Sequence, residues 1–149
     1  MGCMIETSQE TADLISEYEG AMELASDPHW KEHAEAGDCF VAAVRFMEEA
    51  DHPRFVLIHA IVTGTSRDVL GVQYSHGFVL DTQTDLVIDL SCGRRIVLPK
   101  QIYMAIGRVH PEYMRAYSKS RMLQMLAEHG HYGCWELPVD DSGVMKTGC

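Results

Sequence analysis

The sequence contains no asparagine, and it is poor in basic residues, with 12 Lys and Arg against 22 Asp and Glu. The missing asparagine excludes N-glycosylation, which needs that residue as its acceptor. The formal net charge of −10 disfavours binding to nucleic acid or to an anionic membrane surface, because both require basic patches. No apolar run approaches the ~18 residues that span a bilayer. We therefore expect neither nucleic acid nor membrane as a partner.

Cysteines are few and odd in number. There are 5, and no two of them form a Cys-x-x-Cys motif. A disulfide framework would need an even and denser set, so we expect free thiols in a reducing compartment. The first residues, Met1 to Glu10, lack the basic start and the apolar run of a secretory signal. These features together predict a cytoplasmic protein.

A hydrophobic content of 46% over 149 residues is enough for one packed domain. Within that single domain we expect an N-terminal helix and connector over residues 1–36, a core over 37–137 and a polar, frayed tail over 138–149. The short connections between the expected strands favour antiparallel pairing. Helices on either side of a run of strands predict an α+β fold.

Hydrophobic periodicity and turn residues divide the chain into helices and strands. Helices are expected at about Thr7–Ser26, Cys39–Ala50, Lys100–Ile106 and Lys119–Glu128. Strands are expected at about Arg54–Val62, Gln73–Leu80, Leu86–Leu90 and Arg94–Leu98. Ser118 is a candidate N-cap for the last helix, and a turn at Asp81–Asp85 joins the second and third strands.

Cys39 begins the second helix, directly after Gly37 and Asp38. A nucleophilic cysteine must be a thiolate, and the dipole and free N–H groups of a helix N-terminus favour that charge. Gly37 permits a tight turn, and Asp38 is a candidate N-cap. The N–H groups of the first turn can also stabilise an oxyanion. The sequence therefore predicts Cys39 as a nucleophile.

A thiolate also needs a histidine that carries protons, and the histidine needs an acceptor that orients it. His76 lies in the second strand, and Asp89 lies in the third. A hairpin between these strands would bring the two side chains together. A carboxylate within an apolar strand is costly unless it is paired, so Asp89 needs a partner. We predict a Cys39-His76-Asp89 triad.

Cysteine at a helix start, histidine on a later strand and aspartate on the next strand resemble the core of the papain-like and transglutaminase-like thiol proteins. The resemblance is carried by Gly37-Asp38-Cys39, Tyr74-Ser75-His76-Gly77 and Val87-Ile88-Asp89-Leu90-Ser91. Papain orients its histidine with asparagine, which this chain lacks, so the resemblance implies the aspartate arrangement of transglutaminases and arylamine N-acetyltransferases. It implies a helix-start cysteine packed on a small antiparallel sheet. It also implies a thiol hydrolase or acyl transferase that acts on an amide or ester carbonyl without a cofactor or metal.

The chain is also similar to small uncharacterised proteins of phage and bacterial genomes, over most of the range from Gly37 to Leu137. This second likeness is strengthened by Ile58-His59, Leu98-Pro99-Lys100 and Gly133-Cys134-Trp135-Glu136-Leu137. Small phage proteins often act by blocking a host protein. The alternative is therefore a non-enzymatic binding or inhibitor protein on the same fold. Its partner would be a host protein with a basic surface, which suits the acidic surface of this chain, in place of a protein or peptide-like substrate.

Papain-like enzymes usually place a glutamine shortly before the cysteine, as a second oxyanion donor, and this chain has none there. Trp30, His33 and Gln73 are the candidate substitutes, and the sequence does not choose among them. The family also places an aromatic residue beside the cysteine, and Phe40 is the candidate for that part.

Other candidate reactive residues lie outside the triad. His59, a rival to His76, lies in the middle of the first strand, where a structural hydrogen bond is the expected role and a catalytic role or a place in the pocket lining is the alternative. Cys92, close to two arginines, is a second candidate thiol with a weaker case. His129, His131 and Cys134 suggest a zinc site, but a structural zinc needs four converging ligands. A small metalloprotein is therefore the third and weakest hypothesis.

Overall fold

The computed structural model describes residues 39–64, 70–90, 96–140 and 143–145. The strands are β1 (Phe55–Thr63), β2 (Gln73–Asp81), β3 (Leu86–Asp89), β4 (Ile96–Pro99) and β5 (Met114–Tyr117). The helices are α4 (Cys39–Ala50), α5 (Lys100–Gly107), α6 (Lys119–His129) and the short 3-10 helix η3 (Pro111–Tyr113). The described part of the chain thus has an α+β fold, as the sequence predicts.

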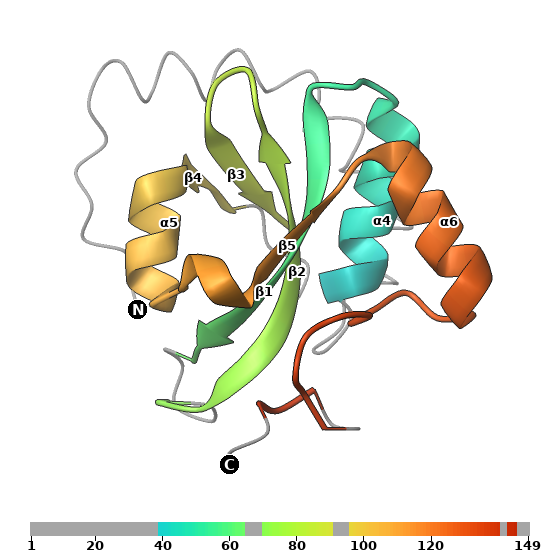
Figure 1. Ribbon diagram of the computed structural model, residues 1–149. Coiled ribbons are helices and arrows are strands. Elements are labelled where there is room, and N and C mark those ends of the chain that lie inside the picture. Colours follow the sequence, from blue (N-terminus) through green and yellow to red (C-terminus); the bar gives the residue numbers. More distant parts are fainter. Residues whose placement is uncertain (1–38, 65–69, 91–95, 141–142, 146–149) are drawn as a thin grey trace.

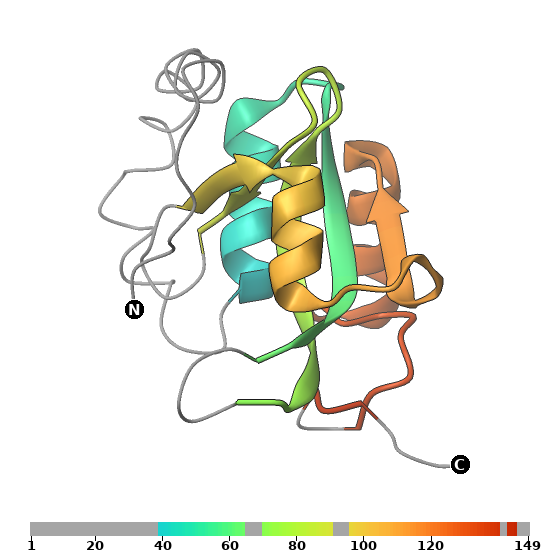
Figure 2. The ribbon, with the colours of Figure 1, turned by 90° about the vertical axis from the view of Figure 1, so that its left-hand side faces the viewer.

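The five strands form one antiparallel sheet in the order β4-β3-β2-β1-β5. Helices α4 and α6 lie against one face of this sheet, and α5 lies against the other (Figure 1). The view turned by 90° shows the same arrangement, with α5 in front of the sheet and α4 behind it (Figure 2). Among the described residues, no helix is long and apolar enough to cross a membrane.

The sequence of strand β1 is a nearly continuous apolar run rather than an alternating pattern, because both faces of the strand are covered. Successive side chains of a strand point to opposite faces of the sheet. Leu57 packs in the cluster beneath α4, and its neighbour Ile58 packs in the cluster beneath α5. Because helices cover both faces, both kinds of position are buried.

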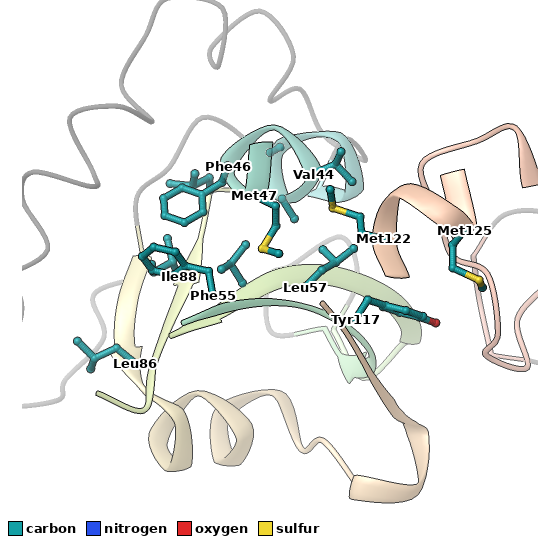
Figure 3. Close-up of a cluster of buried hydrophobic side chains, with 14 residues drawn as sticks. Val44, Phe46, Met47, Phe55, Leu57, Leu86, Ile88, Tyr117, Met122 and Met125 are labelled. Carbon is teal, nitrogen blue, oxygen red and sulfur yellow. The ribbon is translucent and has the colours of Figure 1, made fainter. Parts of the chain in front are cut away.

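The larger apolar cluster lies between the sheet and the helices α4 and α6 (Figure 3). It is built from side chains of both helices and of strands β1, β2, β3 and β5. Its labelled members in Figure 3 are Val44, Phe46, Met47, Phe55, Leu57, Leu86, Ile88, Tyr117, Met122 and Met125. Each fully buried side chain of this size contributes roughly 1.5–3 kcal/mol. This cluster holds the N-terminal turn of α4 against the sheet.

The open end of the β1–β2 hairpin, where Phe55 pairs with Asp81, is fixed by a partly buried ion pair. Arg54 donates from Nε and Nη2 to Oδ2 of Asp81, at 2.9 and 2.7 Å. Asp81 is fully buried, and burial raises the pKa of its carboxyl group. Its other oxygen accepts the backbone N–H of Gln83 at 2.9 Å and so closes the turn into β3.

The predicted helices and strands within the described residues are confirmed to within two residues at each end. Ser118 caps α6, since its hydroxyl accepts the backbone N–H of Arg121 at 3.2 Å. The expected helix Thr7–Ser26 lies outside the described residues. Strand β5 was not predicted, because four residues at a sheet edge show no alternation that sequence periodicity can detect.

The expectation of a frayed tail is wrong for residues 143–145. Val144 forms an antiparallel bridge with Tyr74 of β2, and Met145 forms one with Val139. The backbone of Gln73 accepts the N–H of Met145 at 2.9 Å. The tail is polar in composition, but its backbone pairs with the free edge of β2.

Candidate active site

The edge of β2 that faces away from β1 is covered by three different segments. Strand β3 pairs with it only from Val79 to Asp81. Residues 143–145 pair with it at the other end, where the Ser75 N–H donates to the Gly143 carbonyl at 2.7 Å. Between these segments, the Gly77 N–H donates to Sγ of Cys39 at 3.4 Å. The thiol therefore occupies a gap in the strand pairing along β2.

Gly77 allows the start of α4 to reach the backbone of β2. A methyl group added at Gly77 would lie 2.8 Å from Cδ1 of Phe40 and 3.3 Å from its Cα. Real side chains rarely tolerate such contacts, so any larger residue would push the first turn of α4 away. Phe40 is the aromatic neighbour that the sequence singles out, and it packs on β2 directly beside the thiol.

His76 and Asp89 form a buried pair on the face of the sheet that α5 covers. The register pairs Val79 with Ile88, so His76 and Asp89 share the opposite face, on adjacent strands. Nε2 of His76 lies 2.8 Å from Oδ2 of Asp89. This contact leaves Nδ1 as the ring nitrogen available to Cys39. The structure thus brings together all three residues of the predicted triad.

The charge of His76 follows from its surroundings. Burial, the largest influence, lowers the pKa of His76, but electrostatic interactions and hydrogen bonds with Asp89 and Cys39 oppose it. The combined effect raises the pKa of His76 well above its ordinary value of 6.5. The site therefore favours an imidazolium at neutral pH, flanked by a carboxylate and a sulfur.

Tyr103 is a residue of this site that the sequence analysis did not identify. It lies on α5 and donates its hydroxyl to Oδ2 of Asp89 at 2.7 Å. Burial and the nearby charge of Asp89 raise the pKa of Tyr103 well above 10.0, so the hydroxyl stays protonated. A single tyrosine on an amphipathic helix is typical of a core position. A register for the β3–β4 hairpin could have found it. Asp89 pairs with Ile96, and α5, which carries Tyr103, begins only four residues after Ile96.

His59 is buried without the structural hydrogen bond that the sequence predicts. Its ring packs among Phe40, Tyr117 and Trp135, with ring centroids 4.9, 5.1 and 4.7 Å away. Neither ring nitrogen has a hydrogen-bond partner among the described residues. Burial, aided by the charge of His131, lowers the pKa of His59 to about 3. His59 is therefore a neutral core residue, and the expected hydrogen bond is wrong because aromatic rings surround it.

Of the candidate donors for a second oxyanion contact, Gln73 alone lies within the described residues. Gln73 is exposed at the start of β2, four residues before Gly77. Trp30 and His33 lie outside the described residues, as do Asp38 and the second candidate thiol, Cys92. The first-turn N–H groups of α4 remain as oxyanion donors within the structure, since such groups have no partner inside a helix.

The zinc hypothesis gains no support from the geometry. His129 and His131 lie with ring centroids 5.9 Å apart, and Nδ1 of His131 accepts the Gly133 N–H at 3.2 Å. Within the described ranges, no three His, Cys, Asp or Glu side chains are grouped so that they could hold a metal ion. Burial raises the pKa of the Cys134 thiol, which disfavours a thiolate ligand there.

Comparisons of this chain with models of known protein families, with curated proteins and with solved structures gave no match. The chemistry is therefore argued from the site itself. A thiol at a helix N-terminus, a buried histidine with a raised pKa and a carboxylate on its far nitrogen are the parts of an activated nucleophile.

Proposed function

We propose that this protein is a thiol hydrolase or acyl transferase that acts on an amide or ester carbonyl. The observation that carries the proposal is the buried contact between Nε2 of His76 and Oδ2 of Asp89, at 2.8 Å, beside a thiol held by the Gly77 N–H. A buried ionisable pair between two strands is expensive to maintain for structure alone. Perturbed pKa values of this kind gather at functional sites.

In the first step, the Cys39 thiolate attacks the carbonyl carbon, and a carbon–sulfur bond forms. The carbonyl electron pair moves to oxygen, where the first-turn N–H groups of α4 stabilise the charge. The oxyanion then collapses, and the bond to the leaving amine or alcohol breaks. His76 gives its proton to that leaving group and becomes neutral. The product of this step is a thioester on Cys39.

In the second step, water or an amine attacks the thioester. Neutral His76 accepts a proton from the attacking group, and the carbon–sulfur bond breaks to return the thiolate and the imidazolium. Attack by water gives hydrolysis or deamidation, and attack by an amine gives acyl transfer. Asp89 accepts the hydrogen bond from Nε2 throughout, and so keeps Nδ1 directed at the sulfur.

The proposed fold class is that of the papain-like and transglutaminase-like proteins, which the sequence resembles. Its support is the order of the parts. The nucleophile begins a helix, the histidine lies on a strand, and the aspartate lies on the adjacent strand. The proposed substrates are proteins or peptide-like molecules, since amide and ester carbonyls of this class are what such a thiol attacks.

The test is the pH dependence of alkylation at every cysteine, followed by mass spectrometry, for the wild type and for His76→Ala. We expect Cys39 to react fast at a pH well below that of a free thiol, which is about 8.5. The His76→Ala variant should lose this reactivity. Incubation with small activated esters should then leave an acyl group on Cys39 of the wild type alone.

Five thiols of ordinary reactivity would contradict the proposal. That outcome would favour the alternative of a non-enzymatic binding or inhibitor protein on the same fold. The Cys134 thiol is an internal control, since it lies in the same protein and burial raises its pKa.

A further inference from the structure

We propose that Tyr103 is a positioning residue of this site, which holds the Asp89 carboxylate in the orientation that keeps His76 directed at Cys39. The inference rests on the proposed function and assigns a fourth member to the same site. Tyr103 lies against the carboxylate and acts through it, so it is not itself a catalytic residue.

Two donors from different elements meet one carboxylate oxygen. Oδ2 of Asp89 lies 2.8 Å from Nε2 of His76 and 2.7 Å from the Tyr103 hydroxyl. A carboxylate can rotate about its terminal torsion, which is broad. Donors on two sides of the same oxygen restrict that rotation. The hydrogen bond of Tyr103 therefore fixes where Asp89 points.

Tyr103 is held in place by the packing of its ring and by the connection of α5 to the sheet. Its ring packs on Phe78 of β2, with ring centroids 4.7 Å apart. Strand β4 pairs alongside β3, and α5 starts at Lys100, directly after β4 ends at Pro99. The helix is thus tied to the strand that carries Asp89, and Tyr103 approaches the carboxylate from the covered face of the sheet.

The titratable groups around His76 and its Asp89 partner come from four elements of the described structure. Asp89 lies on β3, Cys39 starts α4, Tyr103 lies on α5, and Tyr74 lies on the same strand as His76 with its ring centroid 6.2 Å away. Tyr103 stays protonated because burial and the charge of Asp89 both raise its pKa. It therefore donates across the whole pH range in which the thiol would work.

The test compares wild type, Tyr103→Phe, Asp89→Asn and the double variant by the pH profile of Cys39 alkylation. Tyr103→Phe removes one hydroxyl and keeps the ring on Phe78. We expect its profile to move to higher pH, with the alkylation rate on the acid side about threefold to tenfold lower, which equals half to one pH unit. In the Asp89→Asn background, the same substitution should add almost nothing, because its effect passes through the carboxylate.

Tyr113→Phe is the matched control, because it removes the hydroxyl of another half-buried tyrosine, in η3 before β5. It should leave the Cys39 profile unchanged. Thermal unfolding of each variant separates a loss of folding from a change in the site. The nitrogen-bound proton of His76 Nε2, followed by NMR, gives a second measure, and its signal should weaken in Tyr103→Phe.

A wild-type profile with low-pH reactivity that Tyr103→Phe does not move would overturn this inference and leave the proposed function intact. Equal effects of Tyr103→Phe in the presence and absence of Asp89 would overturn it as well. A wild-type Cys39 that reacts like an ordinary thiol would instead overturn the proposed function, and this inference with it.

Discussion

Two buried histidines on adjacent strands have pKa values that are shifted in opposite directions. His59 lies opposite Gly77 in the β1–β2 register, and His76 lies opposite Ala60, one position along. His76 has a carboxylate at 2.8 Å, and its pKa is raised well above 6.5. His59 is fully buried among aromatic rings, and its pKa is lowered to about 3. The two rings differ in their partners far more than in their depth.

The comparison shows that burial alone does not prepare a histidine for chemistry. Desolvation disfavours the charged form of both rings. Only His76 faces groups that reverse this effect, Asp89 on one side and Cys39 on the other. The face of the sheet decides the outcome, because Asp89 shares a face with His76 while His59 points to the other face, beneath α4. Each of the following changes tests one part of that difference.

Asp89→Asn should have the largest effect, because it removes the charge that distinguishes the two rings. We expect the pKa of His76 to fall, since burial remains while the carboxylate and its hydrogen bond are lost. Alkylation of Cys39 at about pH 6 should fall about 100-fold, within the range of one to three pKa units for a neighbouring charge. Asp85→Asn is the control, since it neutralises an exposed turn carboxylate at φ 62°, which asparagine tolerates. An unchanged rate in Asp89→Asn would show that His76 does not depend on Asp89.

His59→Leu should have the next largest effect, on stability in acid. The folded protein holds His59 neutral down to about pH 3, while the unfolded chain protonates it below about 6.5. The stabilising contribution is therefore complete above about 6.5 and is lost as the pH falls, by about 1.4 kcal/mol per unit. His76 also affects the pH dependence, because its pKa is raised in the folded state, but this contribution is the same in wild type and in His59→Leu and cancels in their comparison.

Urea unfolding at about pH 5 and pH 7 measures this difference. Wild type should lose about 2 kcal/mol more than His59→Leu between the two values. His110→Leu, which removes an exposed histidine, should lose as much as wild type. Equal losses in wild type and His59→Leu would mean that His59 is protonated inside the fold. Cys39 alkylation should remain unchanged in His59→Leu.

Gly77→Ala should have the smallest effect of the three, and it tests the contact that places the thiol. The added methyl would lie 2.8 Å from Phe40, so the first turn of α4 must shift. We expect a loss of about 1 kcal/mol in unfolding free energy and a slower alkylation of Cys39. Gly107→Ala is the matched control, because its nearest contact is an ordinary 3.4 Å. Undiminished reactivity in Gly77→Ala would show that the thiol does not need its close approach to β2.

The sequence predicted the elements that carry the site well, because their apolar patterns are long and their boundaries are marked by proline, glycine and capping residues. The helix starting at Cys39 and the strands that carry His76 and Asp89 all lie where the periodicity indicates. The proximity of His76 and Asp89 followed from a short hairpin and from the cost of an unpaired buried carboxylate.

The remaining features depend on tertiary packing that a local pattern does not encode. Tyr103 reaches Asp89 only because α5 covers that face of the sheet. His59 was expected to form a hydrogen bond, and only the three-dimensional arrangement shows that its neighbours are aromatic rings. The backbone pairing of residues 143–145 cannot be recognised from the side-chain pattern of the sequence, because it uses main-chain groups alone.

The most direct measurement is an NMR titration of the His76 and His59 side chains in the same sample. The account predicts that His76 stays protonated well above pH 6.5, while His59 stays neutral down to about pH 3. Such a split would establish the charged pair beside Cys39 on which the proposed chemistry depends. Two histidines that titrate together near 6.5, the value of an unperturbed ring, would contradict it.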